Sequence, residues 1–143
     1  MPPYETRKRI EIFTGQMGKR HAAAKIGLPV LDITAMSGNT VFAPDWKILK
    51  QYKQGLVSNG RYTDVYREKM YASMESHPEE WEKLAGYKRV LALCYCAPGK
   101  YCHRHVWLDV VQEYFMQGYC PEHLARDVVN MGEFLGPESV PKP

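Results

Sequence analysis

Three thiols, two imidazoles and one guanidinium lie within twelve residues of the chain, at Cys94, Cys96, Cys102, His103, Arg104 and His105. A thiol can act as a nucleophile, an imidazole can move a proton, and a guanidinium can bind phosphate through paired hydrogen bonds. This combination suits transfer or hydrolysis at a nucleoside or sugar-phosphate bond. We therefore take the segment 94–105 as the candidate functional site.

The roles within this segment follow from position. Cys102, His103 and Arg104 are expected in the first turn of a helix, where free backbone N–H groups attract anions and favour a thiolate. In this hypothesis Arg104 binds the phosphate, His103 acts as acid or base, and Cys102 is the nucleophile or an orienting group. Cys94 ends a buried strand and is a second candidate for catalysis. Arg104 follows Cys94 by ten residues and Cys102 by two, which does not match the spacing of cysteine phosphatases.

Two other interpretations of the same segment stay open. A metal or redox module would bind zinc or iron through a set of four ligands, Cys94, Cys96, Cys102 and His105, although the usual Cys-x₂-Cys knuckle is missing. A purely structural segment would use the cysteines as small buried apolar residues and Arg104 to cap a helix. The preferred hypothesis needs no cofactor.

A second phosphate-binding segment is expected in the turn that contains Thr14, Gly15, Gly18 and Lys19. Glycines allow a phosphate to approach the backbone, and Lys19 offers charge. The turn is not a Walker loop, because only two residues separate its glycines and no Ser or Thr follows Lys19. A turn with incidental basic residues explains the pattern equally well. Asp32, near the end of the next strand, could bind ribose hydroxyls, act as a base, or cap a neighbouring loop.

Alternating strands and helices must position these groups. Strands are expected at residues 10–14, 28–34 and 89–96. Helices are expected at residues 17–26, 45–52, 63–76 with Thr63 as N-cap, 78–85, 103–117 and 123–131. This order predicts parallel crossovers, and hence a single-domain, three-layer, Rossmann-like α/β fold with a mostly parallel sheet. Ligands of such folds bind beyond the carboxyl ends of the strands. Trp46 and Tyr52 could stack on a base there, but their helical spacing favours core packing.

Length and composition agree with one soluble domain. The 143 residues, 45% of them hydrophobic, predict one core over about residues 8–131 and a proline-containing tail over 132–143. We expect no membrane segment, since no run of about eighteen apolar residues occurs. No signal segment is apparent, and the crowded cysteines are typical of reduced thiols, so a cytoplasmic location is expected. The oligomeric state is not predicted.

Charge is distributed unevenly along the chain. The net charge is +3, but residues 1–70 hold twelve Lys and Arg against six Asp and Glu. Such a surplus could face an anionic ligand or nucleic acid, or simply cover solvated helix surfaces. Nucleic acid is the less favoured partner, because no RNA-binding signature, zinc-finger spacing or arginine-rich tail is present.

The sequence resembles the family catalogued as domain of unknown function 488. Leu93-Cys94 matches its apolar strand ending in Cys, and Cys102-His103-Arg104 matches the Cys-His-Arg that opens its next helix. The segments 30–34 and 43–55 extend the resemblance. It implies a compact α/β fold of bacteria and their phages, and it carries no established reaction. Cys96 and His105 depart from the family pattern.

The preferred function is therefore binding of a phosphate-bearing small molecule, such as a nucleotide, by an enzyme that acts on it. One alternative is a phage protein that sequesters a nucleotide or binds a host protein without turnover. The other is the metal or redox module.

Overall fold

In the described part of the chain, four strands form one sheet in the order β2-β3-β1-β4, and every neighbouring pair is parallel. The computed structural model describes residues 8–35, 38–95 and 103–141. The strands are β1 (Arg9–Gln16), β2 (Val30–Asp32), β3 (Arg89–Cys94) and β4 (Asp127–Glu133). The helices are α1 (Arg20–Lys25), α2 (Trp46–Lys53), α3 (Asn59–Ser76), α4 (Pro78–Ala85) and α5 (His103–Met116), with a short 3₁₀ helix η2 (Met17–Lys19) before α1.

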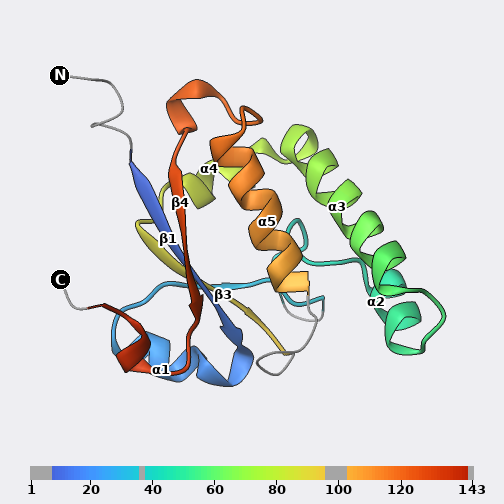
Figure 1. Cartoon of the computed structure of the whole chain (residues 1–143), viewed down its shortest axis with the longest axis horizontal. Coiled ribbons are helices and arrows are strands. Elements are labelled where there is room, and N and C mark those ends of the chain that lie inside the picture. Colours follow the sequence, from blue (N-terminus) through green and yellow to red (C-terminus); the bar gives the residue numbers. More distant parts are fainter. Residues whose placement is uncertain (1–7, 36–37, 96–102, 142–143) are drawn as a thin grey trace.

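Helices cover both faces of this sheet (Figure 1). Side chains alternate along a strand, so Ile10 and Ile12 of β1 join the core that α3, α4 and α5 complete. Phe13 faces the other way and packs with Leu91, Leu93 and the α1 side. The predicted three-layer α/β fold is confirmed. None of the described helices combines the length and the apolar character that crossing a bilayer requires.

Strand β3 lies in the interior of the sheet, between β2 and β1. Its residues from Val90 to Cys94 are all fully buried. This is the strand with the densest apolar run in the sequence, and a central place in a parallel sheet explains that run. The strand expected at residues 28–34 is shorter, because only Val30–Asp32 pairs with β3.

Two expectations about helices are wrong. Residues 123–131 do not form a helix, because Asp127 begins β4 and its N–H donates to the Lys8 carbonyl at 2.9 Å. Helix α3 does not start at Thr63. Ser58 is its N-cap, and the Ser58 Oγ accepts a hydrogen bond from the Arg61 N–H at 3.1 Å, so the N-cap lies five residues earlier than expected.

Strand β4 contains a β-bulge. Ile12 of β1 pairs with Asn130, but the next residue, Phe13, pairs with Gly132, so Met131 is an extra residue in β4. Gly132 has a φ of 80°, which favours glycine, and its N–H donates to the Asn130 Oδ1 at 2.9 Å. A bulge of this kind shifts the alternation of side chains by one position.

This shift decides which side chains of β4 reach each face. After the bulge, Phe134 lies on the α1 face, where it is fully buried and its ring meets that of Phe13 edge-on at 6.4 Å. Glu133 pairs with Thr14 and lies on the α5 face. The core therefore extends beyond residue 131, its expected limit, and β4 presents a carboxylate to the first turn of α5.

Candidate functional site

A fully buried arginine connects three elements at the carboxyl edge of the sheet. The Arg104 Nη1 donates to the Cys94 Sγ at 2.7 Å. The Nε and Nη2 of the same guanidinium both donate to the Glu133 Oε1, at 3.1 and 2.7 Å. Arg104 and Cys94 have no exposed surface, while the Glu133 side chain is 23% exposed. The structure thus brings together Cys94 and Arg104, which the sequence singled out, and adds Glu133.

Local structure explains this meeting. Cys94 is the last residue of β3 and lies on the same face as Val90 and Ala92, which point towards α5. Arg104 is the second residue of α5, so its side chain turns back over the strand ends. Glu133 reaches this face because of the bulge in β4. Three segments that are distant in sequence therefore deliver one thiol, one guanidinium and one carboxylate to one place.

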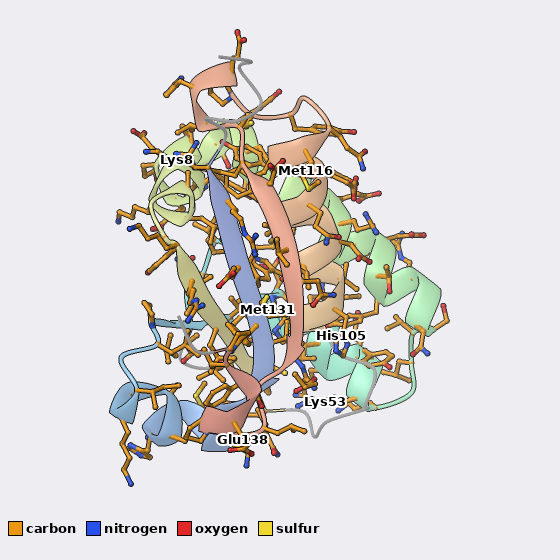
Figure 2. All side chains as sticks on the ribbon, turned by 60° about the vertical axis from the view of Figure 1, so that its left-hand side comes forward. Lys8, Lys53, His105, Met116, Met131 and Glu138 are labelled. Carbon is orange, nitrogen blue, oxygen red and sulfur yellow. The ribbon has the colours of Figure 1, made fainter. Side chains whose placement is uncertain are left out.

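His105 extends the cluster to the surface. Its Nε2 lies 3.6 Å from the Glu133 Oε1, and its side chain is 45% exposed. Figure 2 shows His105 at the start of α5, at the end of the sheet opposite to Lys8. Cys94, Arg104, Glu133 and His105 are called the thiol cluster below. It runs from a buried sulfur to a solvent-accessible imidazole.

The guanidinium of the thiol cluster faces inwards. Its charge-assisted hydrogen bonds to Glu133 and Cys94 compensate the cost of burying it. The second carboxylate oxygen, Glu133 Oε2, is buried and has no hydrogen-bond partner among the described residues. Arg104 is therefore held by the protein's own carboxylate and thiol rather than exposed to a ligand, whereas Glu133 retains unused capacity to accept a hydrogen bond.

His103, the predicted acid or base, contacts the residue that follows β2. It is buried, and its Nε2 lies 2.7 Å from the Ile33 carbonyl oxygen. A carbonyl can only accept, so this nitrogen carries the proton. The ring also meets Tyr66 edge-on at 5.6 Å. These contacts fix the start of α5 against the residue that follows β2, which is a positioning role.

Asp32 makes the contacts of a loop-capping residue. Its Oδ1 accepts from the Thr34 N–H at 2.9 Å, and its carbonyl oxygen accepts from the Asn39 N–H at 2.8 Å. These bonds match the capping alternative raised from the sequence. They arrange the loop that follows β2.

The turn that contains Thr14, Gly15, Gly18 and Lys19, predicted to bind phosphate, is partly a strand. Thr14 is buried and Gly15 lies within β1, paired with Leu93. A Cβ on Gly15 would come within 3.2 Å of the Leu91 Cδ1, so this glycine serves the packing of the sheet. Gly18 and Lys19 lie beyond the strand, in the 3₁₀ helix η2. Gly18 is exposed with open space around its Cα, and Lys19 is half-exposed.

A shallow hollow of about 310 Å³ nevertheless lies at this turn. It is lined by Gln16, Met17, Gly18, Arg20, His21 and Tyr95. Tyr95 follows Cys94 directly, points to the opposite face of the sheet and is 57% exposed. The hollow thus combines basic side chains with an exposed aromatic ring. Tyr95 was not among the ligand-binding residues predicted from the sequence.

The metal alternative depends on residues outside the described ranges. Cys96 and Cys102 both lie there. The predicted role of Cys102 as a nucleophile therefore also concerns a residue outside the described ranges. Among the described residues, no three His, Cys, Asp or Glu side chains gather as metal ligands.

The two aromatic residues proposed for base stacking differ in environment. Tyr52 stacks on Tyr62 of α3, with ring centroids 4.6 Å apart and planes 9° apart, so it packs within the protein. Trp46, at the start of α2, is 48% exposed. Core packing, the favoured expectation for both, is wrong for Trp46.

Comparison with known proteins gives one match. Residues 40–115 match the family model DUF488-N3a, described as the active DUF488-N3 subclade. This range covers more than half of the chain and includes Cys94, Arg104 and His105, while Glu133 lies beyond it. The predicted resemblance to domain of unknown function 488 is confirmed. No curated protein and no solved structure matches the chain.

Proposed function

The chain belongs to the DUF488-N3a family, and we propose that it is an enzyme in which Cys94 attacks a phosphate-bearing small molecule such as a nucleotide. The reaction class is transfer or hydrolysis at a nucleoside or sugar-phosphate bond. The family description as an active subclade supports catalysis. A cytoplasmic location, in a bacterium or a phage-infected cell, is part of the proposal because a reducing compartment preserves a free thiol.

The observation that carries this proposal is the contact between the Arg104 Nη1 and the Cys94 Sγ at 2.7 Å. A guanidinium beside a sulfur favours the thiolate, and the thiolate is the nucleophilic form of cysteine. The contact lies at the carboxyl edge of a parallel sheet, where such folds bind their ligands. An inert structural cysteine would not need a buried cation next to it.

In the proposed step, the Cys94 thiolate forms a bond to an electrophilic carbon of the substrate. The bond to the leaving group breaks, and the leaving group departs with the electron pair and a proton from His105. Water or an acceptor hydroxyl then bonds to the same carbon, the carbon–sulfur bond breaks to release the Cys94 thiolate, and the proton of the attacking group passes to His105. Cys94 is fully buried, so the substrate must reach its sulfur from the edge where β3 ends.

The basic and aromatic hollow beside this edge supports the choice of ligand. Arg20 and His21 line it, and Lys19 is adjacent to Arg20 in sequence. The electrostatic potential of the hollow therefore favours anions. Tyr95 offers an exposed ring on which a base could stack. The hollow and the sulfur flank the end of β3 on its two faces.

The first test measures thiolate formation directly. Absorbance at 240 nm would be followed against pH for the native protein and for Cys94→Ser, and the difference reports Cys94 alone. We expect this step below the ordinary thiol pKa of about 8.5, and a move to higher pH in Arg104→Met. A step at or above about 8.5 would remove the basis of the proposal.

The second test measures turnover. The protein would be incubated with a panel of nucleotides and sugar phosphates, and products would be detected by mass spectrometry. Cys94→Ser should abolish product formation. Cys120→Ser is the matched control, because Cys120 is a half-buried cysteine that lies beyond the opposite end of α5 from Arg104 and should leave turnover intact. Binding without any product would instead support the nucleotide-sequestering alternative.

A further inference from the structure

A further hollow lined by described residues lies at the opposite, amino edge of the sheet. Its volume is about 590 Å³. Lys8 marks this end in Figure 2, far from His105. The size falls within the range of about 300–1,000 Å³ that is typical of small-molecule sites. Nothing in the proposed reaction uses this surface.

Basic residues stand at the start of three neighbouring strands here. Arg89 begins β3 and follows Lys88, Arg9 begins β1 and follows Lys8, and Arg126 immediately precedes β4. The order β3-β1-β4 makes these three strands adjacent. Strands are spaced by about 4.8 Å, so the cations form a row roughly 10 Å long across the sheet edge.

Little negative charge opposes this row. Among the described residues, Glu11 is the only carboxylate that lines the hollow, and it is shared between Arg9 at 2.8 Å and Arg89 at 2.5 Å. Lys8 and Lys88 are exposed and form no ion pair with any described residue. These four cations and one carboxylate leave a surplus of three positive charges before Arg126 is counted.

The hollow also holds one cation in a fixed place and offers apolar surface. The Arg126 Nε donates to the Ala85 carbonyl at 3.2 Å, and its Nη1 donates to the carbonyls of His123 and Ala125 at 3.2 and 3.0 Å. These contacts orient the guanidinium. Ala85 and the half-buried Tyr87 line the same hollow, so a ring system could lie against them.

We propose that this amino-edge hollow is a second ligand site, which binds a small molecule that carries several phosphate groups next to an aromatic ring. A nucleoside triphosphate has this chemistry. The row of cations is short, as a cluster of two or three phosphates requires, whereas a nucleic-acid strand would need positive charge to continue well beyond it. The inference rests on residues other than the thiol cluster and does not depend on catalysis there.

Calorimetric titration of the full chain with ATP tests this site. The double variant Lys8→Ala/Lys88→Ala should raise the Kd by about tenfold or more, because it removes two charges that no described residue neutralises. Lys47→Ala/Lys50→Ala is the matched control. It removes the same charge from exposed positions on α2 and should change the Kd less than about twofold. Circular dichroism would verify that all variants are folded.

Further titrants identify the ligand class. Adenosine should bind far more weakly than ATP, since it lacks phosphate. An oligothymidine of twenty nucleotides that binds much more tightly than ATP would overturn the proposal in favour of a nucleic-acid strand, and equal binding of polyglutamate would overturn it in favour of unspecific charge. Equal weakening in both lysine double variants, or no ATP binding at all, would also refute it.

The outcome is separable from that of the proposed function. ATP binding that survives Lys8→Ala/Lys88→Ala but is lost in Lys19→Ala/Arg20→Ala would refute the amino-edge site and support a ligand at the carboxyl edge. Cys94→Ser should leave binding at the amino edge unchanged, whether or not it abolishes turnover.

Discussion

The buried pair of Arg104 and Glu133 should respond unequally to loss of either partner. Arg104 has no exposed surface, whereas the Glu133 side chain is 23% exposed. Glu133→Leu would leave the Arg104 guanidinium buried without its carboxylate and out of reach of water. Arg104→Met would leave the Glu133 carboxylate without its guanidinium, but this carboxylate can regain part of its hydration. The double variant would leave no charge behind.

The expected magnitudes follow from these exposures. Removing one partner of a buried ion pair costs about 3–5 kcal/mol of unfolding free energy. Glu133→Leu should lie near the upper end of that range and Arg104→Met near the lower end. Arg104→Met/Glu133→Leu should cost less than either single change, because apolar side chains can replace a buried pair at little cost.

Urea-induced unfolding followed by circular dichroism measures these differences, provided that the slope of free energy against urea stays constant among the variants. If Glu133→Leu does not fold, recovery of folding in the double variant tests the same reasoning. Single costs below about 1 kcal/mol, or a double cost equal to the sum of the singles, would show that the pair is hydrated and not a buried ion pair.

Three further predictions concern stability. Burial, followed by the charges of Cys120 and Glu82, raises the pKa of Tyr114 from 10.0 to about 12. As the pH rises, the unfolded chain therefore loses the Tyr114 proton before the folded protein does, so the free energy of unfolding should fall between pH 10 and about 12. Urea titrations across that range should show a smaller fall in the free energy of unfolding for Tyr114→Phe. Ser73→Ala removes the acceptor, at 2.9 Å, of the buried Trp81 Nε1 and should cost about 1–3 kcal/mol by the same assay. Gly132→Ala should cost about 1–2 kcal/mol because of its positive φ, whereas Gly18→Ala, in open space, should cost much less; equal costs would contradict the role of the bulge.

The sequence predicted the central elements well. The continuous apolar run before Cys94 can only be buried on both faces, so β3 and its place inside the sheet followed from composition. The wide apolar stripe after His103 predicted α5 for the same reason. Together these two elements also predicted that Cys94 and Arg104 would meet, because a strand end and the next helix start share one edge of a parallel sheet.

Glu133 could not be predicted in the same way. β4 is an edge strand whose residues are mostly half-buried, so it lacks the alternation that identifies strands. Val128 and Val129 were the only strong local signal, and Gly132 and Gly136 with positive φ became interpretable only in three dimensions. A misassigned helix at residues 123–131 hid the partner of Arg104. Tertiary pairing with β1 decides this segment, not its own propensity.

The bulge in β4 makes the cluster sensitive to the number of residues as well as to their identity. Inserting one residue between Gly132 and Glu133 would shift the alternation by one more position, so Phe134 would turn towards Arg104 and Glu133 would enter the apolar layer around Phe13. An insertion that changes no side chain of the cluster would thereby remove its counter-ion and bury a carboxylate among aromatic rings. Sequences of relatives are best aligned on the glycine of the bulge, Gly132, because the same residues shifted by one position along the strand would point to the opposite face of the sheet.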